Sequence, residues 1–295
     1  MRDSLTQLSD CIEIFNSKTF FVVTGVPKSG TTWVQLLCDV HPEAQCHGED
    51  DFNRLLMNYA NAFNDYNQHS SARNVRLPSG RYAEFLEGDM ERMIAISITM
   101  MLSAGGIPDG VKAFGTKFND LITNNSEFYA ALFRDIPVIH VLRDPRDTLV
   151  SIFYNNHRVG SEVAGQNWPT LAALILDQGP AVVDAVNHAC RVRDSNPATY
   201  HEISYEELSH DGTSAVKRLY EFIGIDSSSA VVENCLSQSS FEKLSGGRKS
   251  GTENVSSFMR KGSTGDWRQK MDDECLEALD ISGISDLVSR LGYDV

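Results

Sequence analysis

The sequence predicts an α/β fold in a single domain, with a central parallel sheet flanked by helices. Short apolar, β-branched runs alternate along the chain with longer stretches of helical periodicity. Such alternation is typical of a parallel sheet with helices on both faces. The 295 residues contain no linker and no internal repeat, so we expect one domain over residues 1–295.

Strands are expected where apolar runs are too short to be helices. Residues 20–23 are apolar throughout, and a loop containing Gly, Pro and Ser follows at once, as expected for a buried parallel strand. Further strands are expected at residues 111–116, 136–142 and 198–203. Helices are expected at residues 31–40, 52–65, 84–103, 147–156, 171–193, 216–223, 229–236 and 273–291. The polar stretch 66–82 and the Gly/Ser/Lys/Arg-rich stretch 245–266 are expected to be loops.

Composition and charge narrow the possible functions. The net charge is −14, which disfavours general binding to nucleic acid or to an anionic membrane. An anionic ligand would need a local pocket that gathers the few basic residues. The six cysteines include no CxxC or CxxxC pair, so we expect neither disulfides nor a metal site. The N-terminus is polar and lacks an apolar segment, and we therefore expect a cytoplasmic protein without a membrane partner.

The strongest local signal is the stretch 22–33, VVTGVPKSGTTW, in which a strand runs through a glycine loop into a helix. Loop amides and the positive end of a helix dipole together form an anion cradle. Gly25 and Gly30 keep the glycine spacing of a Walker A loop, but Thr31 takes the lysine position and the lysine moves to Lys28. A kinase needs that lysine on the β- and γ-phosphates. The loop therefore favours a ligand with a shorter phosphate chain.

Five segments carry a further signal, and in chain order they are PKSGTTW at 27–33, VIHVLRDPRDTLVS at 138–151, SYEE at 204–207, SSF at 239–241 and FMRKGSTGDW at 258–267. Together they resemble the cytosolic sulfotransferases, which use 3′-phosphoadenosine 5′-phosphosulfate (PAPS) and release PAP. This resemblance, from residue 20 to residue 267, implies the P-loop-like sulfotransferase fold and PAPS-dependent transfer.

The resemblance also implies roles for individual residues. The phosphosulfate end of PAPS is expected to contact Lys28, Ser29, Gly30, Thr31 and Thr32. The 3′-phosphate is expected to contact Arg143, Ser151, Arg260, Lys261 and Gly262. The adenine is expected between Trp33 and Phe241, with Tyr205 nearby. Lys28 is also expected to be catalytic, stabilising charge on the oxygen that bridges sulfur and phosphorus. Arginine suits the phosphate because its planar fork matches the oxygens bidentately.

At the position expected for the general base, the sequence departs from the pattern of the cytosolic sulfotransferases. If Lys117 matches the lysine of the family's Lys-Thr-His segment, then Asn119 stands where the histidine would be, and an amide cannot act as a base. The stretch 41–50 resembles instead the segment of tyrosylprotein sulfotransferases in which a Gly-Glu pair supplies a catalytic glutamate. Glu49 follows Lys28 by 21 residues, which fits that family. Glu49 is therefore the predicted base, with His47 second and Asp120 third.

We expect a small-molecule acceptor that carries a hydroxyl or amine. The carboxylates at 49–51 favour a cationic one, whereas a neutral pocket would suit phenols or alcohols. Two alternatives to an active sulfotransferase stay open: a P-loop nucleotide kinase, or a non-catalytic nucleotide-binding protein. The sequence leaves open whether the protein is a monomer or a dimer.

Overall fold

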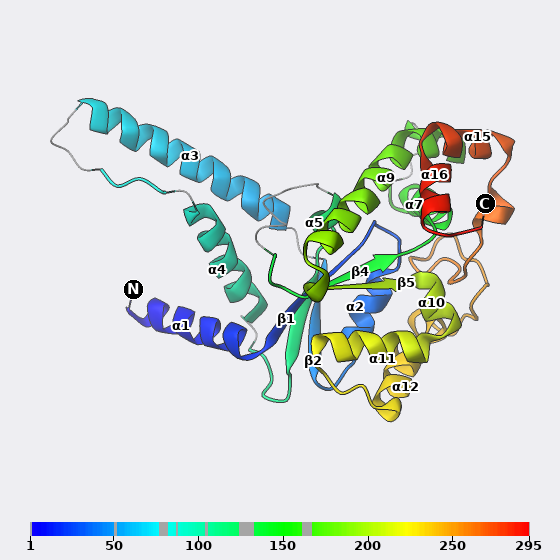
Figure 1. Ribbon diagram of the computed structural model, residues 1–295, viewed down its shortest axis with the longest axis horizontal. Coiled ribbons are helices and arrows are strands. Elements are labelled where there is room, and N and C mark those ends of the chain that lie inside the picture. The colour runs from blue at the N-terminus through cyan, green and yellow to red at the C-terminus, as the bar shows by residue number, and fades with distance from the viewer. Residues whose placement is uncertain are drawn as a thin grey trace.

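A parallel sheet lies at the centre of the computed structural model (Figure 1). The structure describes residues 2–49, 52–76, 82–86, 88–103, 106–123, 133–160 and 167–294. Within these residues the strands are β1 (Thr19–Thr24), β2 (Ala44–Glu49), β3 (Ala113–Lys117), β4 (Val138–Leu142) and β5 (Tyr200–Ser204). Their order in the sheet is β2-β3-β1-β4-β5, and every neighbouring pair is parallel. The predicted α/β class with a central parallel sheet is confirmed.

Both faces of the sheet are buried, as the unbroken apolar run in β1 predicts. Phe20 and Val22 face a core shared with helices on one side, whereas Phe21 and Val23 face a second core on the other. The first side is covered by α4 (Asp89–Ser103), α5 (Asp120–Thr123), α7 (Pro145–Val159), α9 (Leu171–Ser195), α15 (Asp273–Ile281) and α16 (Ile284–Arg290). The second side is covered by α2 (Thr31–Asp39), α10 (Tyr205–His210), α11 (Gly212–Ile223) and α12 (Ser229–Gln238).

Two N-terminal helices pack against α4. Figure 1 shows α1 (Arg2–Ser17), α4 and the long helix α3 (Phe52–Arg76) to the left of the sheet, with α3 reaching furthest from it. The Tyr59 hydroxyl lies 2.7 Å from Ser97 Oγ and joins α3 to α4. The rings of Phe63 and Phe85 stack with centroids 4.0 Å apart. None of the helices in the described ranges has both the length and the apolar character that crossing a membrane requires.

Several elements differ from the sequence-based expectation. Residues 66–76, expected as loop, continue α3, because no Gly or Pro interrupts them before Pro78 and the Asn67 and Asn74 amides bond the backbone of Phe85 and Tyr82. Helix α1 and strand β2 were not predicted. The expected helix 273–291 is broken at Gly283, whose φ of 79° ends α15 and begins α16.

The remaining elements are short. The 3₁₀ turn Pro197–Thr199 precedes β5, and α13 (Phe241–Leu244) and α14 (Trp267–Lys270) flank the stretch 245–266. That stretch forms no helix or strand, as predicted. It nevertheless lies close to the carboxyl ends of β1 and β4, because Arg143 hydrogen-bonds both the loop after β1 and Ser263.

Candidate active site

A pocket of about 540 Å³ opens at the carboxyl edge of the sheet. In open parallel sheets this edge, where the strand order changes direction, is the usual ligand site, and the volume lies within the ~300–1,000 Å³ typical of such sites. Segments far apart in the chain form its wall. Its described lining includes Lys28, Gly30, Thr31, Thr32, Trp33, Lys117, Asn119, Arg143, Ser151, Asn155, Tyr205, Phe241, Phe258, Met259, Arg260, Lys261, Gly262 and Ser263.

The loop between β1 and α2 places Lys28 in an unusual backbone conformation. Its φ is 76°, and it is the one non-glycine residue with positive φ in the described ranges. That conformation costs roughly 1–2 kcal/mol in an L-residue. Its Nζ lies 3.2 Å from Asn155 Oδ1 and 4.0 Å from the centroid of the Phe258 ring. The lysine head is therefore held at the wall of the pocket rather than in solvent.

The turn into α2 is closed by Gly30, which has φ 110° and caps the helix. A Cβ at this position would lie 2.7 Å from the Tyr205 ring, so only glycine fits. The N–H groups of Trp33 and Val34 already donate to the Gly30 carbonyl, at 2.9 and 3.2 Å. Thr31 and Thr32 therefore carry the N–H groups that the start of a helix leaves without a carbonyl partner inside it. Thr32 Oγ1 accepts a hydrogen bond from Lys117 Nζ at 3.2 Å. The start of α2 and a second lysine thus meet at the stretch where the sequence predicts an anion cradle.

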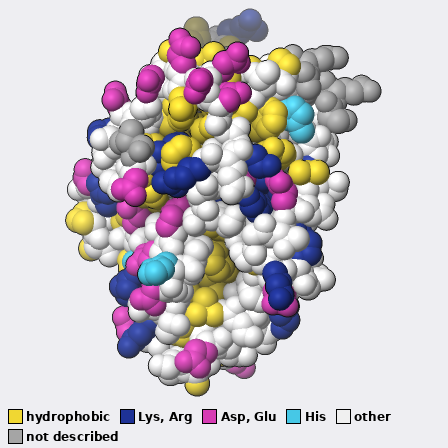
Figure 2. Space-filling model, turned by 90° about the vertical axis from the view of Figure 1, so that its right-hand side faces the viewer, with side chains coloured by type: hydrophobic (Ala, Val, Ile, Leu, Met, Phe, Trp, Pro, Cys, Tyr) yellow, Lys and Arg dark blue, Asp and Glu magenta, His cyan; other side chains and the backbone are white. Residues whose placement is uncertain are grey.

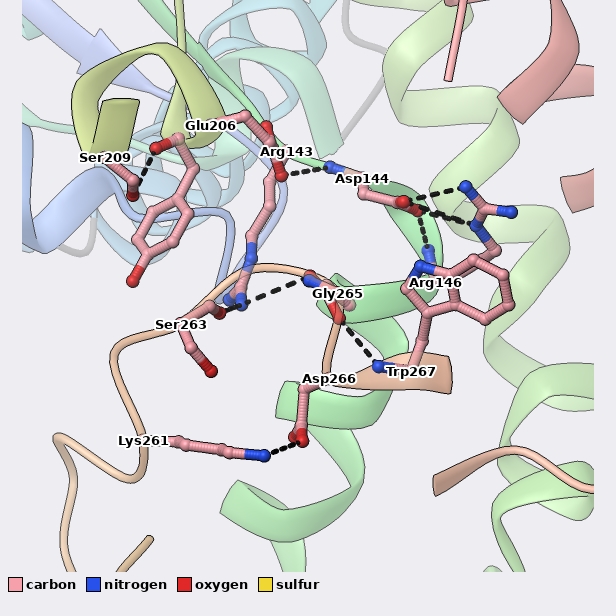
Figure 3. A network of polar contacts seen from close by, with 12 residues as sticks. Arg143, Asp144, Arg146, Glu206, Ser209, Lys261, Ser263, Gly265, Asp266 and Trp267 are labelled. Atoms are coloured by element: carbon pink, nitrogen blue, oxygen red, sulfur yellow. Dashed lines mark hydrogen bonds and ion pairs between the residues drawn. The ribbon is translucent and has the colours of Figure 1, made fainter. Parts of the chain in front are cut away.

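Arg143, at the end of β4, joins two loops of the pocket. Its Nη1 donates to the Lys28 carbonyl at 3.2 Å. Its Nη2 donates to the carbonyl of Ser263 at 3.1 Å, and Figure 3 shows Arg143 beside Ser263. The guanidinium lies 4.3 Å from the centroid of the Tyr205 ring. Burial raises the pKa of this phenol above its ordinary value, so Tyr205 stays neutral. Arg143 Nε and Ser263 Oγ are buried without a protein partner in the described chain. These two polar atoms fit an anion that would bond to them.

Arg260 and Lys261 lie in the C-terminal loop and bind carboxylates. Lys261 Nζ and Arg260 Nη2 each lie 2.5 Å from an oxygen of Asp266, and Arg260 Nη1 also pairs with Glu253. Figure 3 shows the contact between Lys261 and Asp266. Burial would raise the pKa of Asp266, but the bonds from Lys261 and Arg260 outweigh it and hold this pKa below its ordinary value. One ionised carboxylate therefore faces two cations.

The same loop is anchored on α7 through Asp147. This buried carboxylate accepts hydrogen bonds from the backbone N–H of Gly265 at 2.6 Å and of Trp267 at 2.9 Å. Burial raises its pKa, although Arg143 nearby acts in the opposite direction. Trp267 is thereby fixed, and Arg146 lies 3.8 Å from the centroid of its ring.

Three aromatic side chains, those of Trp33, Tyr205 and Phe241, line the pocket. Trp33 and Tyr205 meet edge to face with centroids 5.5 Å apart. Gly262, with φ 65°, lies against the ring of Phe241, and a Cβ there would come within 2.2 Å of it. Trp33 and Phe241 both line the pocket, as predicted for residues that bracket a base.

The pocket is basic although the chain is acidic. Lys28, Lys117, Arg143, Arg260 and Lys261 line it, and no Asp or Glu does so among the described residues. Figure 2 shows Lys and Arg side chains on both sides of a recessed apolar strip, while acidic side chains gather at the top of that face. The expected local concentration of basic residues is therefore present. The described residues include no group of three His, Cys, Asp or Glu that could hold a metal ion.

The residues predicted as general base lie at or near the same edge of the sheet. Glu49 ends β2, and its Cα pairs with that of Lys117 on β3 after a bulge that follows His47. The side chain of Glu49 lies outside the described part of the structure, as does that of Asp120. His47 is half-buried and is not among the described residues that line the pocket. Asn119 does line it.

Ser29, which the resemblance implies as a contact of the phosphosulfate, has a buried side chain. Its side chain is 2% exposed, and a Cβ on Gly25 would lie 2.6 Å from its Oγ. The described pocket wall therefore contains its neighbours Lys28 and Gly30 but not Ser29.

Sequence reasoning missed Asn155 and Phe258, which contact Lys28. A periodicity signal could have indicated the first, because Asp147, Ser151 and Asn155 recur every four residues on one face of α7. Asn155 Oδ1 also accepts a hydrogen bond from Arg158 at 3.1 Å. Phe258 lies within the FMRKG segment, but nothing in the sequence placed its ring over a lysine.

The fold and this site define a class of protein: an α/β protein with a P-loop-like anion cradle, a second basic loop and an aromatic platform between them. The family model for the sulfotransferase domain matches residues 18–282. The chain therefore belongs to the sulfotransferase family.

Individual relatives are distant. Rat sulfotransferase 1A1 is 26% identical over 151 residues, which cover 46% of this chain and 50% of that protein. The chain thus spans about half the length of this curated relative. Cytosolic sulfotransferase 17 of Arabidopsis thaliana is 23% identical over 88% of this chain and 72% of its own. The solved structure of mouse sulfotransferase SULT7A1 complexed with PAP has a TM-score of 0.58 at 17% identity, covering 93% of this chain and 89% of that one. Sulfotransferase STF9 from Mycobacterium avium has a TM-score of 0.53 at 14% identity, with 98% and 81% covered.

Proposed function

We propose that the protein transfers the sulfuryl group of PAPS to a hydroxyl or amine of a small-molecule acceptor and releases PAP. The observation that carries the proposal is the pocket itself, in which five cations and no described carboxylate line a cavity of about 540 Å³ within a chain of net charge −14. Membership of the sulfotransferase family supports the same reaction. Residues 1–295 would act as one catalytic domain.

The residues present fit PAPS as donor. PAPS has an anionic group at each end and an adenine base between them. The pocket has an anion cradle after β1 and basic residues around Arg143 and Lys261, and it has aromatic rings at Trp33 and Phe241. The partnerless buried atoms Arg143 Nε and Ser263 Oγ supply donors for a phosphate. Arg260 and Lys261 would each share their charge between Asp266 and that phosphate.

When bound, PAPS supplies an activated sulfuryl group, and the protein positions the reactants and stabilises charge. The bond from sulfur to the bridging oxygen breaks as the acceptor's oxygen or nitrogen bonds to sulfur. Lys28 would stabilise the charge left on the bridging oxygen. Lys117 and Thr32, already in contact with each other, would hold sulfonate oxygens beside it.

Glu49 is the proposed base that takes the acceptor's proton. Its support is the position of its backbone, at the carboxyl end of β2 and paired with Lys117 of the pocket wall. A carboxylate shielded from water beside a substrate can have its pKa raised into a useful range. His47, two residues earlier on the same strand, is the second candidate.

The acceptor's charge is a separate part of the proposal. The carboxylates at 49–51 support a cationic acceptor, although Asp50 and Asp51 lie outside the described residues. A cationic acceptor should show a KM that rises as salt shortens the Debye length from ~30 to ~8 Å. A KM that stays flat over this range would favour a neutral phenol or alcohol. The acidic chain and the relative named as cytosolic support a cytoplasmic enzyme without nucleic-acid or membrane partners.

The test is transfer of ³⁵S from labelled PAPS to a panel of phenols, alcohols and amines, including cationic ones, with PAP quantified in parallel. We expect a labelled product and an equal amount of PAP with at least one acceptor. The Lys28→Ala variant serves as the blank for each acceptor. Phosphate transfer from ATP that requires Mg²⁺, with no PAP formed from PAPS, would favour a kinase instead.

A further inference from the structure

The guanidinium of Arg248 lies inside the stretch 245–266 and binds four acceptors. Its Nη1 donates to the carbonyl oxygens of Thr252 and Arg260, both at 3.0 Å. Its Nη2 donates to Ser257 Oγ at 3.0 Å and to the carbonyl of Met259. One side chain therefore fixes four points along a segment that has no helix or strand of its own.

Arg248 also reaches the aromatic platform of the pocket. The centre of its guanidinium lies 5.3 Å from the centroid of the Phe241 ring, which Gly262 also contacts. The backbone that it holds at residues 259 and 260 leads directly to Lys261 and Gly262. Arg248 is thus in contact with both Phe241 and the loop that carries Arg260.

The other hydrogen bonds of this loop close around the same residues. The N–H of Gly251 donates to the Lys261 carbonyl and that of Asn254 to the Arg260 carbonyl, both at 2.8 Å. Irregular backbone leaves carbonyl oxygens that need partners, and buried ones are costly to leave unsatisfied. Arginine offers five N–H donors in a rigid fork, whereas the donors of lysine sit on one nitrogen. Lysine at position 248 could not bond all four acceptors.

We propose that Arg248 is a positioning residue: it fixes the loop of Arg260, Lys261 and Gly262 against Phe241, and so couples binding of the base to binding of the 3′-phosphate. Arg248 is not among the described residues that line the pocket, so it acts through the residues that do. The inference rests on the proposed function, because it takes the nucleotide to be PAPS or PAP.

The test compares Arg248→Ala and Arg248→Lys with Lys249→Ala, which removes the same charge from an exposed neighbour. Affinities for PAP and for adenosine 5′-monophosphate (AMP), which lacks the 3′-phosphate, are measured by calorimetry. We expect Arg248→Ala to weaken the binding of PAP at least about tenfold more than the binding of AMP, which is a change of about 1.4 kcal/mol in discrimination between the two nucleotides. The KM for PAPS should rise while kcat at saturation changes little. Arg248→Lys should behave like Arg248→Ala, and Lys249→Ala like the wild type.

Trypsin supplies a second readout that needs no nucleotide. Folded protein is treated with trypsin, and mass spectrometry measures the rate of cleavage after Lys249, Arg260 and Lys261. This rate should be higher in both Arg248 variants than in the wild type. An Arg248→Lys enzyme that discriminates between PAP and AMP like the wild type, and is cleaved at the wild-type rate, would overturn the proposal. Because this variant is tested as well, the experiment remains decisive if Arg248→Ala does not fold. Failure of the wild type to bind PAP would overturn the proposed function instead, while the cleavage rates would still decide whether Arg248 holds the loop.

Discussion

Arg143 donates a hydrogen bond to the backbone carbonyl of Lys28 across the carboxyl edge of the sheet, at 3.2 Å. Its other arm reaches the carbonyl of Ser263. The loop that would bind the 5′ end of the nucleotide and the loop that would bind its 3′ end are therefore joined through one buried guanidinium.

Replacement of Lys28 by Ala should lower kcat by about 10²–10³-fold, because the charge that develops on the bridging oxygen loses its partner. The affinity for PAP should change much less, since the loop amides and Arg143 remain. Steady-state kinetics and calorimetry measure the two quantities. Lys217→Ala, a change at an exposed lysine on α11, is the matched control. A Lys28→Ala enzyme with wild-type kcat would contradict the catalytic role of Lys28.

Replacement of Arg143 by Ala should mainly raise the KM for PAPS. It removes charge-assisted hydrogen bonds worth about 1.5–3 kcal/mol to a 3′-phosphate. The expected signature is a lost preference for PAPS over adenosine 5′-phosphosulfate, whereas Arg193→Ala on the exposed end of α9 should keep it. An equal loss of affinity for both nucleotides would show that Arg143 does not bind the 3′-phosphate.

Glu49→Gln should retain PAP binding and lose about 10²–10⁴-fold in turnover, because an amide cannot accept the acceptor's proton. Glu221→Gln, at an exposed position, controls for the loss of a negative charge. His47→Ala should keep most of its activity. The reverse pattern, an active Glu49→Gln and an inactive His47→Ala, would transfer the role of base to His47.

Asp266→Asn should destabilise the fold by about 1–3 kcal/mol at neutral pH, because the bonds of Arg260 and Lys261 to an ionised carboxylate are weakened. Since the folded-state pKa of Asp266 is lowered, its stabilising effect is present above the ordinary value of about 3.9 and is lost as pH falls through the folded-state value. Denaturant melts from pH 3 to 8 should show a wild-type advantage that is constant above about pH 5 and shrinks in acid. A difference independent of pH would rule out the ion pairs as its source.

The parts of the fold and site that are encoded in short contiguous stretches were predictable. The run 20–23 predicted β1, and the glycines around Lys28 predicted the cradle. Arg143 and Ser151 lie on the pocket wall as their segment implied. Strand β2 was missed because AQCHGE mixes small and polar residues without alternation, and it is defined by its pairing with β3.

Contacts between distant residues were not predictable. The left-handed conformation of Lys28 depends on how the loop closes against Tyr205 and Arg143, not on lysine itself. The sequence showed Arg260 and Lys261 as basic residues, but Asp266 is their shared partner in the fold. In the sequence, Arg248 is one more basic residue in a glycine-rich loop. Its role depends on four hydrogen-bond acceptors that only the folded loop brings together.

The most direct test of the central claim is calorimetric titration of the wild-type protein in EDTA with PAP, AMP and ATP, repeated with Mg²⁺. The two basic loops and the aromatic platform predict one PAP site per chain that needs no metal, and an affinity for PAP at least about tenfold above that for AMP, which corresponds to about 1.4 kcal/mol from the 3′-phosphate. Equal affinities for PAP and AMP, or tight binding of ATP only when Mg²⁺ is present, would contradict the account.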